Sequence, residues 1–269
     1  MLRPNRFKRA LRGDTPLFGL INSVPAPLLV EMLGYAGYDF VILDLEHVSP
    51  NPETLENLIR AAECCDVTPL VRVPGAQPDV ILRVLDAGAQ GIVVPHVCSA
   101  EEARIAVRAS RYHPVGARGI SGGRTTGFGT LSLPDYMALA NTEILVAVMI
   151  EDREGVEAID DIVAVEGVDL VIEGAIDLSQ SFGVPCQPQH ADVLTALDLI
   201  AERSRVAGVP YCAVPRADGQ LGQWLRRGVR SFLVGDDRGV IFRALKAHIA
   251  GLREQASSAR WSTLSGPDA

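Results

Sequence analysis

Short apolar runs rich in Val, Ile and Leu alternate along the chain with longer segments whose apolar residues recur at helical spacing. The runs predict strands at 16–22, 39–44, 68–73, 90–94, 143–150, 168–173, 209–214 and 230–235. The segments between them predict helices at 26–36, 52–64, 77–87, 99–110, 153–163, 188–207, 218–227 and 236–254. Strands that are apolar throughout and alternate with helices are typical of a parallel sheet covered by helices. Eight such units favour a closed (β/α)8 TIM barrel over an open doubly wound sheet.

Two segments interrupt this alternation. Residues 112–134 form a long Gly-rich connection, and a connection of that length inside a compact barrel is usually functional. We expect its stretch 116–129 to be a mobile lid, with Arg118 and Arg124 meeting an anionic substrate. Residues 255–269 lack helical periodicity and predict a disordered tail, which leaves residues 1–254 as one barrel domain.

Composition narrows the class of protein. The 269 residues suffice for one large core, and a formal net charge of −8 argues against nucleic acid as a partner. No apolar run approaches the roughly 20 residues that span a membrane, and the basic N-terminal segment leads into no apolar stretch of a secretory signal. The five cysteines are odd in number and lack metal-ligand spacing. We therefore expect a reduced, cytoplasmic protein with no membrane partner.

Acidic side chains follow two of the predicted strands that would be neighbours in the barrel. Glu151 ends the fifth strand, and Asp177 follows the sixth after a short turn. In a barrel both would lie at the mouth formed by the C-terminal ends of the strands. Each taken singly could be a cap for the next helix. Together they would repel unless a cation lay between them, and oxygen ligands of this kind suit Mg²⁺ or Mn²⁺.

Other polar residues also end strands. Arg72 ends a buried strand and must find an anion, either a structural carboxylate or a substrate oxyanion. His47 lies in the run DLEH, where Asp44 could orient its imidazole for acid–base chemistry, although His47 could also be an ordinary surface histidine. For His96 the two interpretations are equally open.

One absence bears on the chemistry. The only lysines are Lys8, before the first strand, and Lys246, in the last helix. A Schiff-base aldolase needs a lysine inside the barrel. The sequence also lacks the glycine-rich loops that bind dinucleotides or nucleotide phosphates. We expect a divalent metal ion, without a Schiff-base lysine, NAD or PLP.

A series of motifs resembles one family. The segments YDFVILDLEH, LVRV, LDAGAQGIVVP, RYHPVGARG, VMIEDREGV and EGVDLVIEGAIDLSQSFG follow in the order found in the HpcH/HpaI aldolase/citrate lyase family. The resemblance spans residues 6–254 and implies a barrel of the phosphoenolpyruvate/pyruvate-domain type that acts on a 2-oxo acid, pyruvate or oxaloacetate. It also implies a divalent cation, with Mg²⁺ first and Mn²⁺ or Co²⁺ as alternatives, and a homo-oligomer, either a dimer or a hexamer with exchanged C-terminal helices.

The same resemblance implies roles for individual residues. Glu151 and Asp177 would hold the metal, and Arg72 the keto oxygen as it becomes an enolate. His47 with Asp44 would be the acid–base pair, and Asp86 would reach the site of a neighbouring subunit. Gly174 and Ala175 would also bind the substrate, and we add Arg118 and Arg124 of the Gly-rich stretch and Glu173 as further substrate-binding residues.

Two departures from the family pattern bear on the substrate. Met149 stands where the aldolases typically have Gln, and Glu173 replaces a small residue. A carboxylate there could act as a base or orient a group towards a second substrate. These features resemble the siderophore-pathway citrate synthases of the staphyloferrin B type, which join oxaloacetate and acetyl-CoA. The alternative is an aldolase that cleaves 4-hydroxy-2-oxoheptanedioate or 2-dehydro-3-deoxyglucarate to pyruvate and an aldehyde. A non-catalytic relative is a third possibility, which the acidic pair, Arg72 and His47 argue against.

Overall fold

Eight parallel strands close into a barrel in their order along the chain. The computed structural model describes residues 1–262. Its strands are β1 (Leu17–Asn22), β2 (Phe40–Asp44), β3 (Thr68–Arg72), β4 (Gly91–Val94), β5 (Leu145–Ile150), β6 (Leu170–Glu173), β7 (Tyr211–Ala213) and β8 (Ser231–Asp236). The prediction of a (β/α)8 barrel is confirmed, because every strand lies within about two residues of its expected position.

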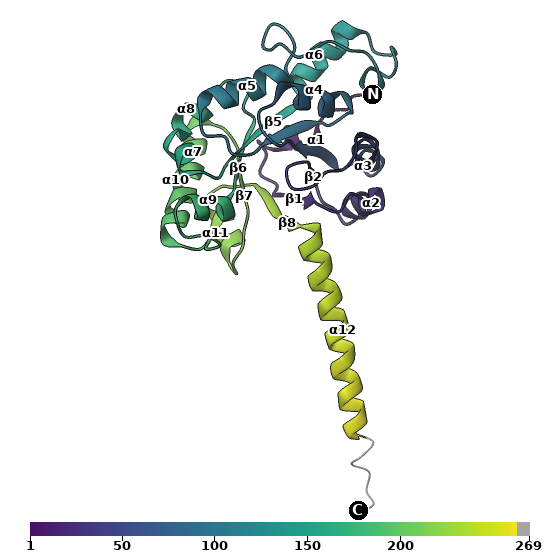
Figure 1. The fold of residues 1–269 in the computed structure, drawn as a ribbon, viewed down its shortest axis with the longest axis vertical. Helices are drawn as coiled ribbons and strands as arrows, with labels where there is room; N and C mark the ends of the chain where they lie inside the picture. The colour runs from purple at the N-terminus through teal and green to yellow at the C-terminus, as the bar shows by residue number, and fades with distance from the viewer. Residues whose placement is uncertain (263–269) are drawn as a thin grey trace, which may run out of the picture.

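Helices surround the barrel (Figure 1). They are α1 (Arg6–Ala10), α2 (Pro27–Tyr35), α3 (Pro52–Cys64), α4 (Pro78–Asp86), α5 (Ala100–Ser110), α6 (Leu133–Glu143), α7 (Arg153–Glu157), α8 (Ile159–Val163), α9 (Ala175–Ser181), α10 (Ala191–Ala207), α11 (Gln220–Arg226) and α12 (Asp237–Ser262), with a short 3-10 helix at Arg124–Thr126.

Three α-helices were not expected, namely α1, α6 and α9. Most of helix α6 occupies residues 135–142, which were assigned to no element, and its two ends overlap the Gly-rich connection and the expected start of the fifth strand. Its start is fixed by Ser132, whose side chain accepts a hydrogen bond from the backbone N–H of Asp135. The single helix expected at 153–163 is divided at Ala158 into α7 and α8.

The inside of the barrel is filled by side chains that point inward from the strands. Helix α1 closes the N-terminal end of this core, where Phe7 stacks on Phe40 with 4.1 Å between ring centroids. Below it, Asp169 accepts hydrogen bonds from Lys8 Nζ at 3.0 Å and from Arg111 Nη2 at 2.9 Å. Burial lowers the pKa of Lys8 and of Arg111. The negative charge of Asp169 acts against this effect and favours the charged form of both side chains.

Helix α12 leaves the barrel instead of packing along it and projects far beyond the other helices (Figure 1). The expectation of a disordered tail is wrong for residues 255–262, which continue this helix; residues 263–269 lie outside the described part. The hydroxyls of Ser257 and Ser258 donate to backbone carbonyls one turn earlier. These two serines, which the sequence assigned to a tail, therefore form hydrogen bonds within the helix. No described helix is both long and apolar enough to cross a membrane.

Replacing the carboxylate below α1 tests this closure of the barrel. We expect Asp169→Asn to lower the free energy of unfolding by about 3 kcal/mol, because Lys8 and Arg111 would keep buried charges without a partner. Urea denaturation measures the change, with the exposed Asp161→Asn as control. Equal unfolding free energies for the two variants would contradict this role of Asp169.

Candidate active site

A cavity of about 670 Å³ opens at the C-terminal ends of the strands. Five of the predicted site residues line it, namely Arg72, Glu151, Glu173, Gly174 and Asp177. Met149 and Arg216 line it as well. The expectation that strand-end residues converge on one mouth therefore holds for residues that come from β3, β5 and β6.

Glu151 lies at the floor of this cavity and is buried, with 2% of its surface exposed. Its Oε1 accepts a hydrogen bond of 2.9 Å from the backbone N–H of His96. Burial raises the pKa of Glu151 to about 7, and the negative charges of Asp177 and Glu46 add to the rise. A cation beside these carboxylates would reverse that effect, so the donor set fits a divalent metal ion.

Gly174 makes room for Glu151. A Cβ atom at position 174 would lie 2.3 Å from Glu151 Oε2 and 2.4 Å from Glu151 Cβ. Ala175, the first residue of α9, is buried next to it, and Asp177 follows in the first turn of the same helix. The short β6–α9 connection thus brings Asp177 to the same cavity as Glu151.

Arg72 binds the carboxylate of Asp44, which is one of the two kinds of anionic partner expected for it. The strand register places Asp44 of β2 beside Arg72 of β3. Arg72 Nε and Nη2 each donate to one oxygen of Asp44 at 2.9 Å, and Nη1 lies 2.9 Å from Glu46 Oε2. Burial alone would raise the pKa of Asp44, but the two hydrogen bonds and the charge of Arg72 hold it below its ordinary value.

The expected pairing of Asp44 with the His47 imidazole is wrong. From His47 Asp44 accepts only the backbone N–H, at 3.4 Å, while its two oxygens also accept hydrogen bonds from the Arg72 side chain and the Glu46 backbone. The imidazole itself is 58% exposed and lies 3.9 Å from Glu46. His47 therefore has no carboxylate that fixes the orientation of its ring among the described residues, and it does not line the cavity.

The imidazole of His96, whose role the sequence left open, has more contacts with carboxylates than that of His47. Its Nδ1 lies 2.8 Å from Asp152 Oδ2 and its Nε2 lies 3.4 Å from Glu46 Oε1. Its backbone is in the left-handed region, with φ of 53°, which is uncommon for a residue other than glycine. Glu46, His96 and Glu151 each offer one ligand atom within 4.8 Å of the others, so they form a second possible metal-binding group that shares Glu151.

The Glu173 carboxylate binds two side chains, one from β7 and one from the loop that follows it. The Tyr211 hydroxyl donates to Glu173 Oε2, and Arg216 Nη1 lies 3.3 Å from Glu173 Oε1. The sequence did not indicate Arg216, because its contact with Glu173 joins residues 43 positions apart. The signal available was an arginine that follows an apolar strand by only a few residues, as Arg72 ends its own.

Asp44, His47 and Ala175 are not among the residues that line this cavity, and three further predicted residues, Arg118, Arg124 and Asp86, do not line it either. Arg118 is buried, donates to Asp86 at 2.7 Å and lies 4.9 Å from the ring centroid of Tyr112. Arg124 pairs with Glu63. The expectation that these two arginines meet a substrate is therefore wrong for the mouth of the same chain, since carboxylates of α3 and α4 hold them at the side. That the stretch 116–129 is a mobile lid stays a prediction. The role of Asp86 towards a second subunit stays a prediction.

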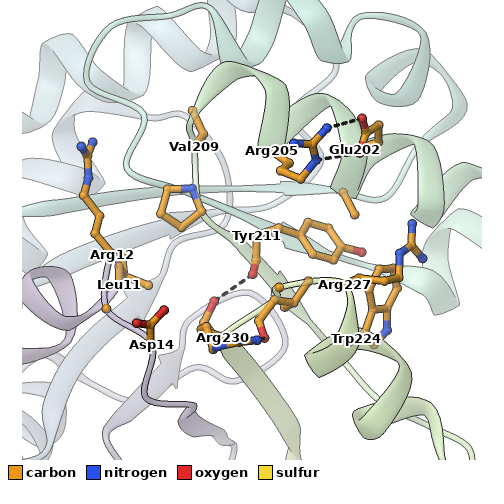
Figure 2. A pocket seen from close by; sticks show the side chains of 16 residues that line it. Leu11, Arg12, Asp14, Glu202, Arg205, Val209, Tyr211, Trp224, Arg227 and Arg230 are labelled. Carbon is orange, nitrogen blue, oxygen red and sulfur yellow. Dashed lines mark hydrogen bonds and ion pairs between the residues drawn. The ribbon is translucent and has the colours of Figure 1, made fainter.

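A second cavity, of about 350 Å³, lies where β7 and β8 begin, at the opposite end of the barrel (Figure 2). Arginines line it, but Arg205 is paired with Glu202 and Arg227 with Asp198. Unlike the mouth, this cavity has no cluster of carboxylates among the described residues that line it. The mouth is therefore the candidate active site.

The space left by Gly174 gives a test of the site. We expect Gly174→Ala to displace the Glu151 carboxylate and to weaken Mn²⁺ binding by at least about 10-fold, as loss of support for a ligand typically does. Electron paramagnetic resonance of Mn²⁺ measures the affinity. Gly251→Ala, on α12 with nothing within 4 Å of the added carbon, is the matched control. Unchanged Mn²⁺ affinity in Gly174→Ala would place the cation away from Glu151.

Comparison with known proteins agrees with this geometry. Residues 18–244 match the HpcH/HpaI aldolase/citrate lyase family. The 5-keto-4-deoxy-D-glucarate aldolase of Enterobacter sp. (strain 638) is 36% identical over 248 residues, which cover 92% of this chain and 96% of that protein. The crystal structure of the citrate synthase SbnG is 44% identical, with a TM-score of 0.86, and covers 93% of this chain and 98% of its own. An HpcH/HpaI aldolase from Desulfitobacterium hafniense DCB-2 is 31% identical, with a TM-score of 0.87 over 92% of this chain and 96% of its own. The chain therefore belongs to the HpcH/HpaI aldolase/citrate lyase family of enzymes.

Proposed function

We propose that this enzyme joins oxaloacetate and acetyl-CoA to form citrate, with the help of a divalent metal ion. The observation that carries the proposal is the 44% identity to the citrate synthase SbnG over 93% of the chain, compared with 36% to the curated aldolase. The departures from the aldolase pattern, Met149 and Glu173, both line the candidate active site. A place in siderophore biosynthesis and a cytoplasmic location stay predictions from the sequence.

The metal ion would be held by Glu151 and Asp177, with Mg²⁺ as the first candidate and Mn²⁺ or Co²⁺ as alternatives. What supports this pair over the group of Glu46, His96 and Glu151 is that Glu46 already lies against Arg72, whereas Asp177 has no hydrogen-bond or ion-pair partner among the described residues. A cation bound there would polarise the keto group of the oxo acid.

The chain's own residues would orient the reactants and move protons. Arg72 lies in the cavity and, held by Asp44, would place positive charge at the oxygen that becomes negative. A base would take a proton from the methyl group of acetyl-CoA, and the resulting carbanion would attack the keto carbon of oxaloacetate. Water would then cleave the thioester and release CoA. His96, oriented by Asp152, is better held for this proton transfer than the exposed His47.

The alternative is an aldolase that releases pyruvate from a 4-hydroxy-2-oxo acid. It is favoured by the 36% identity to 5-keto-4-deoxy-D-glucarate aldolases over 92% of this chain. The same metal and Arg72 would then stabilise the enolate of pyruvate. The two functions differ in the reaction partner and not in the position of the site.

A direct assay separates the two functions. Incubation with oxaloacetate, acetyl-CoA and Mg²⁺ should yield citrate and free CoA, and EDTA should abolish the product. Glu151→Gln and Asp177→Asn should each lower citrate formation by about a hundredfold or more. Citrate and CoA are measured, and pyruvate release from 4-hydroxy-2-oxo acids is followed in parallel. Rapid pyruvate release with no citrate would contradict the proposal and return the protein to the aldolases.

We also propose that the enzyme is a homo-oligomer in which α12 packs on α2 of another copy. Phe242, Leu245, Ile249 and Leu252 form an exposed stripe along α12, repeating every three or four residues. Helix α2 exposes Leu28, Met32 and Tyr35 at similar spacing. Two apolar stripes on one chain are typical of an interface between copies.

Sedimentation of the wild type at micromolar concentration should show a dimer or a larger assembly. Leu245→Glu should shift it towards the monomer, because it places a charge in the stripe. Val206→Glu, at an exposed apolar position on α10, should leave the assembly unchanged. A monomeric wild type at every concentration would contradict the proposed packing.

A further inference from the structure

We infer that Arg216, held in place by Glu173, binds the second carboxylate of a 2-oxo dicarboxylic acid and so selects a dicarboxylate over a monocarboxylate substrate. The inference rests on the proposed function, since it assumes that a 2-oxo acid binds beside Glu151 and Asp177. It adds a specificity-determining residue that the sequence did not indicate.

Arg216 lies where it can meet a substrate. It follows β7 at the C-terminal mouth and lines the same cavity as Glu151 and Asp177. Its side chain keeps 24% of its surface exposed. Its hydrogen bonds use one nitrogen: Nη1 lies 3.3 Å from Glu173 Oε1 and donates to the Val214 carbonyl at 3.0 Å. Nε and Nη2 have no partner among the described residues.

This geometry differs from that of Arg72, the arginine that β3 brings to the same cavity. Arg72 uses Nε and Nη2 to bind both oxygens of Asp44, which leaves that fork fully engaged. Arg216 meets Glu173 through a single nitrogen, and its remaining donors form the planar edge that binds a carboxylate in two parallel hydrogen bonds. The pair therefore positions Arg216 without using up its capacity to bind an anion.

Glu173 is suited to hold the arginine and not to react. It is 2% exposed, and its two oxygens are taken by Tyr211 and Arg216. Without Arg216 it would be a buried carboxylate with only neutral hydrogen-bond partners, the Tyr211 hydroxyl and the Val214 backbone, which is costly. Of the two roles that the sequence left open for Glu173, orienting a group is the one that these contacts favour.

The free donors of the cavity, and not its net charge, point to a ligand with a second carboxylate, because Glu173 already offsets the charge of Arg216. Glu151 and Asp177 are balanced when a divalent cation is bound, and the charge of Arg72 is offset by Asp44 and Glu46. A 2-oxo acid with one carboxylate would leave the free edge of Arg216 to water. A second carboxylate would satisfy it, and oxaloacetate is a 2-oxo acid with two carboxylates.

Binding of two oxo acids that differ only at this end tests the inference. Oxaloacetate carries a carboxylate where 2-oxobutyrate carries a methyl group. Calorimetry with Mg²⁺ present gives the dissociation constant of each. The wild type should bind oxaloacetate about 10- to 100-fold more tightly, as expected for a hydrogen bond between charged groups. Arg216→Gln should remove that preference and leave 2-oxobutyrate binding unchanged.

Two further variants sharpen the comparison. Glu173→Gln should weaken oxaloacetate binding less than Arg216→Gln does and should spare 2-oxobutyrate, because the arginine stays but is held less firmly. Arg226→Gln, an exposed arginine at the end of α11, is the matched control and should change neither affinity. If Arg216→Gln fails to fold with Glu173 left unpaired, the double variant Glu173→Gln/Arg216→Gln removes both charges and should show the same loss of preference.

The outcomes separate the inference from the proposed function. A wild type that binds both oxo acids, together with an Arg216→Gln variant that keeps the preference for oxaloacetate or loses both ligands equally, overturns the role of Arg216 alone. A wild type that binds neither oxo acid in the presence of Mg²⁺ overturns the proposed 2-oxo acid site and the inference with it.

Discussion

The arrangement of the active site depends on one constraint, the need to balance carboxylates that the barrel buries at its mouth. The negative charge of Asp44 is balanced by Arg72, which binds both of its oxygens. Glu173 is balanced by Arg216 and accepts a hydrogen bond from Tyr211. Glu151 has only a backbone N–H and a partly exposed imidazole against it. Burial therefore raises its pKa, and the charge of Asp177 raises it further. The remaining imbalance is centred on Glu151 and Asp177, where a divalent cation would restore neutrality.

The parts of the fold and site that the sequence could predict are those that depend only on the order of residues along the chain. The strands were predicted because they are apolar along their whole length, so no assumption about their neighbours was needed. Glu151 and Asp177 were placed correctly because strand ends meet at one mouth in any such barrel. Both inferences use only order along the chain.

What the sequence could not predict is the partner of each charge. Asp44 pairs with Arg72 and not with the His47 imidazole because the register places those two residues side by side on neighbouring strands. Arg118 and Arg124 were expected at the substrate, yet Asp86 and Glu63 hold them at the side of the barrel. Arg216 was missed because its link to Glu173 joins residues 43 positions apart. Pairing of charges is a property of packing, which periodicity does not encode.

The central claim is that Glu151 and Asp177 together hold the metal ion. Anomalous diffraction from crystals soaked in Mn²⁺ tests it most directly, because the signal locates the ion itself. The account predicts one strong peak bonded to a carboxylate oxygen of Glu151 and one of Asp177. A peak bonded to Glu46, His96 and Glu151, with Asp177 uninvolved, would contradict it.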